Sequence, residues 1–245
     1  MIDIHCHLLP GIDDGASSLE QSLHMARLAV EEGITHAVLT PHICPGRWEN
    51  TTAIIASATE TFRHALAGEG IPLQVEYAAE VRISDQIFSL LAADDIPFLG
   101  EWEGYRVMLL EFPHTHILPG TDKLVDWLIR QGIRPLIAHP ERNRELMQKP
   151  DKLRPLLDKG CLAQLTCASI TGRFGADARA AAEYYIRENL ITLIASDAHN
   201  TSTRPPAMAA AREAIGELVG EDVATRLAIE APARLVSARF ATAEA

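Results

Sequence analysis

The sequence predicts an α/β fold, either a β/α barrel or a doubly wound parallel sheet. Short apolar or β-branched segments recur along the chain every ~27–37 residues, and a helix-like stretch follows each of them. Most of these segments are almost continuously apolar, as expected when helices cover a parallel sheet. No Gly-x-Gly-x-x-Gly pattern follows the first segment, which disfavours a dinucleotide-binding sheet.

Seven segments are predicted to be strands, at 2–5, 36–40, 73–79, 105–110, 134–138, 161–166 and 191–195. Helices are predicted between them, because apolar residues recur there at helical spacing and glycines follow several of the stretches. The first helix begins at the capping-box pattern Ser17-x-x-Glu20 and ends before Gly33. The other predicted helices span 52–66, 122–130, 151–159, 177–188, 205–218 and 221–229.

Composition narrows the function classes. The 245 residues carry a formal net charge of −11 with His neutral, and such a chain repels DNA and RNA. The length predicts a single domain over 1–245, with 241–245 as a loose tail. No apolar run approaches the ~20 residues that cross a bilayer, and the N-terminus lacks a signal-peptide pattern. Four Cys without Cys-x-x-Cys spacing predict reduced thiols in the cytoplasm.

Metal-capable side chains occur at the ends of six of the seven predicted strands. The first strand ends in His5-Cys6-His7, and because side chains alternate along a strand, the two imidazoles share one face. Such a pair is typical of a divalent-metal site. The other candidates are Asp13 or Asp14 in the following loop, and His42, Glu80, Glu111, His139, Asp197 and His199 at later strand ends. In a β/α barrel these ends meet at one rim, which predicts a metal site there.

The motifs resemble those of a known family. The chain opens with D-I-H-C-H-L-L-P-G-I-D-D-G at 3–15, and T-P-H at 40–42, A-H-P-E-R at 138–142, Q-L-T at 164–166, T-G-R-F-G at 171–175 and S-D-A-H-N at 196–200 follow. This order is similar to that of the polymerase-and-histidinol-phosphatase (PHP) superfamily. Within it, the chain resembles the bacterial manganese-dependent tyrosine phosphatases that act on kinases controlling capsule and exopolysaccharide export. The resemblance covers essentially the whole chain and implies a distorted seven-stranded (β/α)7 barrel.

The resemblance also implies three divalent metal ions. Position by position, the ligands would be His5, His7, Glu80 and Asp197 for the first ion, Glu80, Glu111 and His139 for the second, and Asp14, His42 and His199 for the third. Only the resemblance favours Asp14 over Asp13. Because no Cys belongs to the set, the donor chemistry admits Mn²⁺, Fe or Zn²⁺, and the family favours Mn²⁺.

Such a cluster predicts hydrolysis of a phosphate ester, in which a water bridging the metals is acidified and attacks phosphorus in line. Arg142 and Arg204 closely follow two ligand motifs and are predicted to bind phosphoryl oxygens. A tyrosine phenol, with a pKa of about 10, departs with less protonation than an alkoxide needs, and His199 is the candidate to assist. The predicted function is a cytoplasmic protein-tyrosine phosphatase whose partner is the phosphotyrosine tail of a bacterial tyrosine kinase.

Four alternatives stay open at the level of sequence. A small phosphate monoester such as histidinol phosphate would use the same site. Hydrolytic deaminase or amidase barrels also begin with His-x-His, although no predicted strand here ends in the Lys that they carboxylate. A non-catalytic, metal-dependent regulator would only bind the kinase. Cys167 and Arg173 fit the Cys-x5-Arg loop of cysteine-dependent phosphatases, although Phe174 replaces the usual hydroxyl residue after the Arg.

The roles of a few further residues are also open. Arg173, His114 and His116 are candidates for substrate contact or for plain surface positions. Trp48 and Phe112 are candidates to stack on an aryl ring or to pack in the interior.

Overall fold

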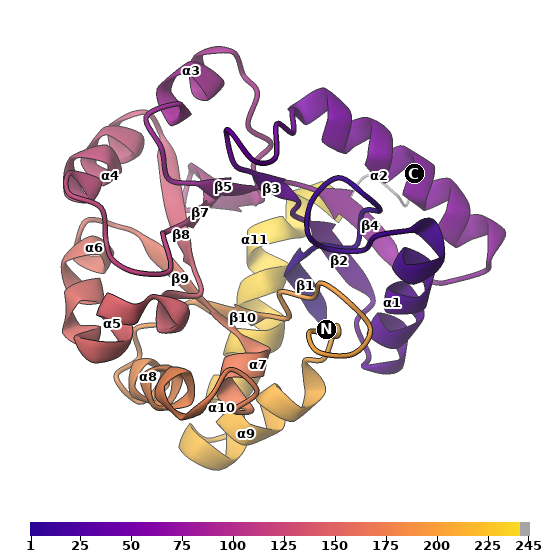
Figure 1. Ribbon diagram of the computed structural model, residues 1–245. Coiled ribbons are helices and arrows are strands. Elements are labelled where there is room, and N and C mark those ends of the chain that lie inside the picture. Colours follow the sequence, from indigo (N-terminus) through magenta and orange to yellow (C-terminus); the bar gives the residue numbers. More distant parts are fainter. Residues whose placement is uncertain (241–245) are drawn as a thin grey trace.

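The computed structural model describes residues 1–240 and contains parallel strands with helices around them (Figure 1). The predicted α/β fold with parallel strands is confirmed. The predicted loose tail at 241–245 lies outside the described residues, so the extent of the single domain stays a prediction.

The strands form two sheets. They are β1 (Ile2–Cys6), β2 (His36–Leu39), β3 (His42–Ile43), β4 (Gln74–Tyr77), β5 (Glu80–Arg82), β6 (Gly100–Trp102), β7 (Tyr105–Glu111), β8 (Ile133–Ala138), β9 (Leu162–Thr166) and β10 (Leu193–Ala195). One sheet has the order β1-β2-β4, and the other has the order β10-β9-β8-β7-β5-β3. Neighbouring strands are parallel throughout, except that β6 pairs antiparallel with β7.

Two of the predicted strands bend and then resume. β2 ends at Leu39 and the chain continues as β3 at His42, because the intervening Pro41 has no N–H for the ladder. In the same way, β4 gives way to β5 at Glu80, whose N–H donates to Pro41 O over 3.1 Å across the bend. The predicted strand ends at 40 and 79 are therefore wrong, and His42 and Glu80 lie in short strands rather than after strands.

Hydrogen bonds between β1 and the segment after β10 join the two sheets at their other edge. Asp197 N donates to His5 O and His7 N donates to Ala198 O, each over 2.8 Å. With the bends at the opposite edge, these bonds link the parallel segments into a barrel-like ring. Because the bonds lie at the carboxyl ends of β1 and β10, they also position the residues that follow both strands.

The helices are α1 (Leu19–Glu31), α2 (Thr52–Gly68), α3 (Ile87–Ala92), α4 (Thr121–Arg130), α5 (Arg144–Gln148), α6 (Arg154–Asp158), α7 (Cys167–Ile170), α8 (Ala176–Arg187), α9 (Ala209–Val219), α10 (Glu221–Thr225) and α11 (Ala231–Phe240). 3₁₀ turns lie at Pro140–Arg142 and Pro150–Leu153, and a π-helical turn lies at Arg226–Glu230. The sequence analysis did not predict α11. It also missed the short elements β6, α3, α5 and α7, which have too few residues to show a periodic pattern of apolar residues. Within residues 1–240, no helix is long and apolar enough to span a membrane.

Helix α1 begins one residue later than predicted. Its N-cap is Ser18, whose side chain accepts a hydrogen bond from Gln21 N over 3.2 Å. Gln21 Oε1 in turn accepts from Ser17 N over 2.8 Å. The reciprocal capping bonds therefore use Gln21 and not Glu20, because the chain turns into the helix after Ser18.

The interior of the ring is apolar, and α11 closes one end of it. Ile4, Leu109 and Leu193 from the strands form one buried cluster with Leu235 and Val236 from α11. Figure 1 shows α11 in the middle of the ring of strands, with the other helices outside. Helix α11 contacts β6, which pairs with the first residues of β7. It therefore covers the amino ends of the strands and leaves their carboxyl ends open to polar side chains.

Replacing Gly100 by Ala is expected to destabilise the protein by about 1–3 kcal/mol, because α11 packs directly against this residue. A Cβ at Gly100 would lie 2.1 Å from Leu235 O, which is backbone and cannot move aside alone. The matched control is Gly68→Ala at the end of α2, where a Cβ meets nothing within 4 Å. Urea denaturation of both variants measures the difference, and equal stabilities would contradict the packing described for α11.

Candidate metal centre

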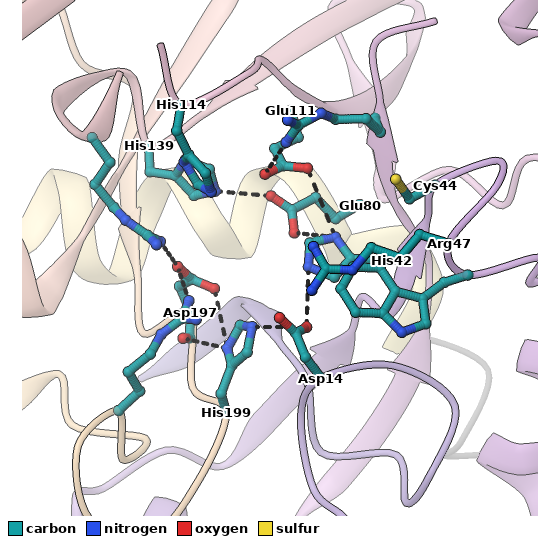
Figure 2. Close-up of a pocket in the computed structure, with 14 residues that line it drawn as sticks. Asp14, His42, Cys44, Arg47, Glu80, Glu111, His114, His139, Asp197 and His199 are labelled. Carbon is teal, nitrogen blue, oxygen red and sulfur yellow. Dashed lines mark hydrogen bonds and ion pairs between the residues drawn. The ribbon is translucent and has the colours of Figure 1, made fainter. Parts of the chain in front are cut away.

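All nine predicted ligands converge at the carboxyl ends of the strands. Seven of them line a cavity of about 290 Å³: Asp14, His42, Glu80, Glu111, His139, Asp197 and His199. His5 and His7 are fully buried and contact the ligands that line the cavity. Figure 2 shows the labelled side chains pointing toward one another across the cavity. The prediction that these residues share one rim is confirmed, and their assignment to individual ions stays a prediction.

His5 and His7 from β1 form a group with Glu80 and Asp197. His5 Nε2 lies 3.3 Å from Glu80 Oε2, 3.4 Å from Asp197 Oδ1 and 3.3 Å from His7 Nε2. His7 Nε2 lies 3.4 Å and 3.5 Å from the same two oxygens. Metal–ligand distances of about 2.0–2.2 Å put neighbouring donors about 3.0–3.5 Å apart. The spacing of these four donors therefore fits one divalent ion between them.

The far nitrogens of both imidazoles are held by buried hydrogen-bond partners. His5 Nδ1 lies 2.9 Å from Gln164 Oε1 on β9, and His7 Nδ1 lies 2.7 Å from Asp13 Oδ2. Since an amide oxygen and a carboxylate only accept, each Nδ1 carries the proton and each Nε2 presents its lone pair. Asp13 thus orients a ligand, and Asp14 is the residue that faces the ion-binding space, as the resemblance implied.

Two further groups share ligands with the first. His42, Glu80 and Glu111 offer donor atoms close together, and His139 Nε2 lies 2.9 Å from Glu80 Oε1. Glu80 therefore directs its two oxygens to different groups, which fits the bridging role implied for it.

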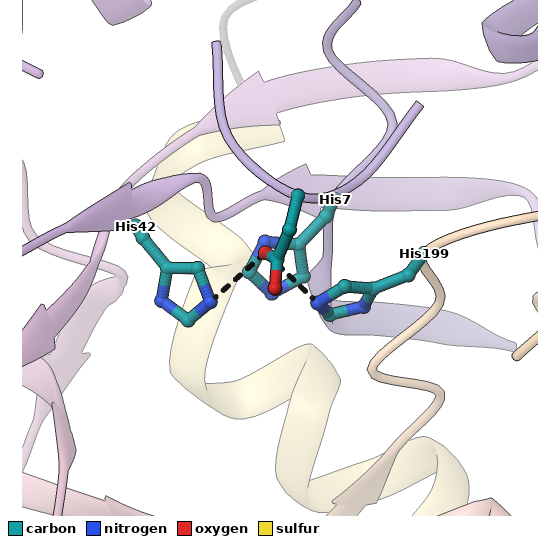
Figure 3. A group of neighbouring side chains, drawn as sticks. His7, His42 and His199 are labelled. Carbon is teal, nitrogen blue, oxygen red and sulfur yellow. Dashed lines mark ion pairs between the residues drawn. The ribbon is translucent and has the colours of Figure 1, made fainter. Parts of the chain in front are cut away.

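The last group combines Asp14 and His199 with His7 and His42 (Figure 3). Asp14 Oδ1 lies 3.3 Å from His42 Nε2 and 3.5 Å from His199 Nε2. The ring of His7 lies 3.9 Å from that of His199, measured between centroids. The third predicted ligand set is thus assembled, with His7 as an additional neighbour.

Three buried atoms in the cluster have no hydrogen-bond partner among the described residues: Glu80 Oε2, Asp197 Oδ1 and His42 Nδ1. His42 Nδ1 lies 3.0 Å from Glu80 Oε2, but the two atoms do not have hydrogen-bond geometry. A buried, unpaired carboxylate oxygen costs several kcal/mol unless a cation compensates it. These atoms therefore fit metal binding on a criterion independent of ligand spacing.

The histidines of the cluster differ in the direction in which their surroundings shift the pKa. Burial lowers the pKa of His139 to about 4, assisted by the charge of Arg142, and burial with the nearby His7 lowers the pKa of His199 to about 4. Burial also opposes protonation of His5, but Glu80 and Asp197 outweigh it and raise its pKa. His139 and His199 are thus neutral donors at pH 7, whereas the pKa of His5 is raised by two carboxylates that are themselves candidate ligands.

Two of the ligands are among the five non-glycine residues with positive φ in the described part of the chain. His139 and Asp197 have φ values of 34° and 53°, in the left-handed region that side chains disfavour. Such residues cost about 1–3 kcal/mol each unless the surroundings impose the conformation. Around Asp197, the buried Asp3 carboxylate accepts from Ser196 N over 3.0 Å and also from Ser196 Oγ. Asp3 thereby anchors the segment that carries Asp197.

Arg142 and Arg204 both pair with Asp197 and both line the cavity. Arg204 Nη2 lies 2.6 Å from Asp197 Oδ2, the oxygen that faces away from His5, and Arg142 Nη1 contacts the same atom. The Phe174 ring packs against both guanidinium groups, 4.5 Å and 5.8 Å from their central carbons. Arg204 Nε is buried and unpartnered among the described residues. A guanidinium has five N–H donors and each arginine engages Asp197 through one nitrogen, so both retain donors for an anion in the cavity.

Sequence reasoning missed several contributors to the site. Arg82 Nη1 lies 2.7 Å from Glu111 Oε1, and Arg47 belongs to the cavity wall. Arg82 follows Glu80 by two residues on a strand, and this spacing alone would have placed both on one face. Asp3 and Gln164 lie in the motifs that carry the resemblance, but their partners are distant in the chain and their roles were not predicted, and no sequence signal marks Arg47.

The cysteine-dependent alternative is wrong. Cys167 lies on α7 with 1% of its surface exposed, outside the cavity, and burial raises the pKa of its thiol well above the usual value. A nucleophilic Cys needs access and a lowered pKa. Arg173 is exposed and does not line the cavity.

Of the two aromatic candidates, one lies at the cavity and the other in the core. Trp48 lines the cavity and stacks on His42, with ring centroids 4.8 Å apart, whereas Phe112 is buried in the core. His114 lines the cavity near His139, and His116 is not among the lining residues.

The family model described as capsular polysaccharide synthesis, CpsB/CapC, matches residues 1–237. This chain belongs to the CpsB/CapC family. The tyrosine-protein phosphatase YwqE of Bacillus subtilis is 40% identical to it over 204 residues, which cover 83% of this chain and 79% of YwqE. The tyrosine-protein phosphatase CpsB of Streptococcus pneumoniae is 29% identical over 242 residues, which cover 96% of this chain and 98% of CpsB.

Solved structures agree with this membership. A structure from a study of YwqE and CpsB, described there as unique metal-dependent tyrosine phosphatases, has a TM-score of 0.90 and 36% identity. The match covers 97% of this chain and 94% of that one. A phosphotriesterase homology protein from Escherichia coli has a TM-score of 0.61 at 11% identity, which is a likeness of fold alone.

Replacing Asp13 by Asn is expected to lower the affinity for metal by about 10–100-fold, because a neutral amide holds and polarises the His7 ring less well. Metal content after equilibration in metal-buffered solutions measures this effect. The control is Asp126→Asn, which removes a carboxylate bound to Lys159 over 2.7 Å on the surface. An Asp13→Asn variant that binds metal as tightly as the control would contradict the orienting role.

Proposed function

We propose that this protein is a metal-dependent protein-tyrosine phosphatase that acts on the phosphotyrosine tail of a bacterial tyrosine kinase in capsule or exopolysaccharide synthesis. The observation that carries the proposal is the convergence of nine metal-capable side chains and two arginines on one cavity. The names of the relatives support tyrosine phosphate as the substrate over histidinol phosphate.

The proposed cofactor is a set of three divalent ions, with Mn²⁺ as the favoured metal. His5, His7, Glu80 and Asp197 would hold one ion, Glu80, Glu111 and His139 a second, and Asp14, His42 and His199 a third. The donors are nitrogen and carboxylate oxygen without sulfur, which suits Mn²⁺, Fe and Zn²⁺. Bound metals supply Lewis acidity, which lowers the pKa of water and neutralises charge on a phosphoryl group.

Arg142 and Arg204 bind the phosphoryl oxygens in this proposal. Their pairing with Asp197 Oδ2 and their packing on Phe174 hold both guanidinium groups in place before substrate arrives. A pre-positioned donor stabilises charge that develops in the transition state without reorganisation.

For His199, the geometry favours a ligand role over proton donation to the leaving phenol. Its Nδ1 lies 3.0 Å from Asp197 O, an acceptor, so the neutral ring carries its proton there and presents a lone pair at Nε2. A tyrosine phenol, with a pKa of about 10, departs as an anion more readily than an alkoxide. An aryl phosphate therefore suits a site whose histidine is occupied as a ligand.

We infer that the protein works in the cytoplasm, where its substrate kinase exposes a soluble tail. The four cysteines are free in the structure, which is typical of a reducing compartment.

Hydrolysis of a phosphotyrosyl peptide is expected to stop in chelator and to return when Mn²⁺ is added. The ligand side chains alone cannot supply the Lewis acidity that lowers the pKa of the attacking water. Cys167→Ser is expected to retain wild-type activity, whereas Glu80→Gln is expected to lose it even with added metal. Measuring kcat/KM for the peptide and for histidinol phosphate in parallel tests substrate class. Full activity in chelator, or a preference for histidinol phosphate, would overturn the proposal.

Arg142→Ala and Arg204→Ala are each expected to lower kcat/KM on the order of 10²-fold, as removal of a transition-state donor does. Arg173→Ala, an exposed arginine outside the cavity, is the matched control and is expected to change kcat/KM little. Both cavity arginines also touch Asp197, so metal content is measured beside activity. Loss of activity in step with loss of metal would assign them to ligand positioning and not to phosphate binding.

A further inference from the structure

Arg47 is a cation in the cavity wall that the proposed chemistry does not use. Figure 2 shows Arg47 on one side of the cavity and Asp197, with which Arg142 and Arg204 pair, on the other. The side chain of Arg47 is exposed, whereas the cluster around Asp197 is buried. Arg47 therefore lies toward solvent, away from the phosphoryl-binding arginines.

The loop that carries Arg47 is tightly folded. Arg47 N and Trp48 N both donate to Cys44 O, over 2.9 Å and 2.8 Å, and Cys44 N donates to Trp48 O over 3.0 Å. Gly46, with φ at +84°, allows the chain to reverse in the middle of this turn. At its base, Asn50 Nδ2 donates to His42 O over 2.8 Å. The position of Arg47 is thus set by the backbone of the loop.

Aromatic contacts also hold the side chain itself. The central carbon of the Arg47 guanidinium lies 3.8 Å from the centroid of the Trp48 ring, within cation–π distance. Trp48 stacks on His42 at an interplanar angle of 10°. A guanidinium that is already ordered loses little conformational entropy when it binds a partner.

The charge of Arg47 is not compensated by the described residues. Arg82 pairs with Glu111, and Arg142 and Arg204 pair with Asp197, so each of these cavity arginines faces a carboxylate. Arg47 has no ion pair within residues 1–240. An ordered guanidinium without an anion is suited to bidentate recognition of a carboxylate supplied from outside.

We propose that Arg47 is a specificity-determining residue that binds an acidic side chain, Asp or Glu, next to the phosphotyrosine of the substrate. The inference rests on the proposed function, because it requires a phosphotyrosyl peptide in the cavity. The phenyl ring of phosphotyrosine separates the phosphorus from the peptide backbone, so flanking side chains lie at the mouth when the phosphoryl group reaches the metal ligands. The chain as a whole, at −11, repels an acidic peptide, and Arg47 reverses that sign where the flank would lie.

The test compares kcat/KM for three phosphotyrosyl peptides that differ only in their flanking residues, which are Glu, Ala or Lys. The metal-loaded wild type is expected to prefer the Glu peptide to the Ala peptide by on the order of five- to tenfold, as a partly exposed, charge-assisted pair would give. In Arg47→Ala this ratio is expected to fall to about one, and Arg47→Lys is expected to retain part of it. Arg47→Glu is expected to prefer the Lys peptide.

Arg187→Glu, which makes the same charge change at an exposed position at the end of α8, is the matched control and is expected to keep the wild-type ratio. Equal losses on all three peptides in Arg47→Ala would overturn the proposal and assign Arg47 to the phosphoryl group. Equal turnover of the Glu and Ala peptides by the wild type would overturn it while leaving the proposed function intact. A wild type that cleaves p-nitrophenyl phosphate but none of the peptides would overturn both.

Discussion

Glu80 and Asp197 are carboxylates from which water is almost entirely excluded, and the arrangement of the whole rim follows from the need to compensate their charge. Burial opposes ionisation of both groups. For Glu80 the histidines His5 and His42 outweigh that penalty, and for Asp197 the surrounding His5, Arg142 and Arg204 do so, so that both pKa values lie well below the usual range. One oxygen of each carboxylate is still unpartnered. An unpartnered buried carboxylate oxygen is suited to bind a cation, and both carboxylates belong to the groups of side chains that could hold a metal ion.

The barrel-like ring brings these charges together, and the burial of its apolar residues offsets the free-energy cost of holding them away from water. Its apolar interior and outer layer provide the burial that drives folding, while the carboxyl ends of the strands carry the polar cluster. Positive φ angles at His139 and Asp197 are tolerated because neighbouring bonds impose them, most directly the Asp3–Ser196 pair beside Asp197. A rigid supporting layer of this kind keeps ligands in position before any metal binds.

The balance of charge differs between the whole chain and the cavity, where four arginines match the four lining carboxylates Asp14, Glu80, Glu111 and Asp197. The chain as a whole is acidic, yet four arginines line the cavity: Arg47, Arg82, Arg142 and Arg204. Three of them pair with candidate metal ligands and thereby join the buried network. Arg47 is exposed and packs on the Trp48 ring. In the proposed function, the paired arginines face the phosphoryl group, and Arg47 faces the residues that flank the phosphotyrosine in the substrate.

The sequence by itself determined the alternation of strands and helices, the nine candidate ligands and the two arginines near Asp197. These features were readable because the ligands lie in short strands or in the loops that follow them, so that a local pattern implies a common rim. The short elements β6, α3, α5 and α7 escaped prediction because packing, not periodicity, stabilises them.

Only the tertiary structure decided which of Asp13 and Asp14 faces the cluster, that Cys167 is buried away from it, and that Gln164 and Arg47 belong to it. Each of these outcomes depends on contacts between segments far apart in the chain, or on the direction of a side chain after a turn. Local sequence patterns carry no information about such contacts, because they arise only when the strands have closed into a ring.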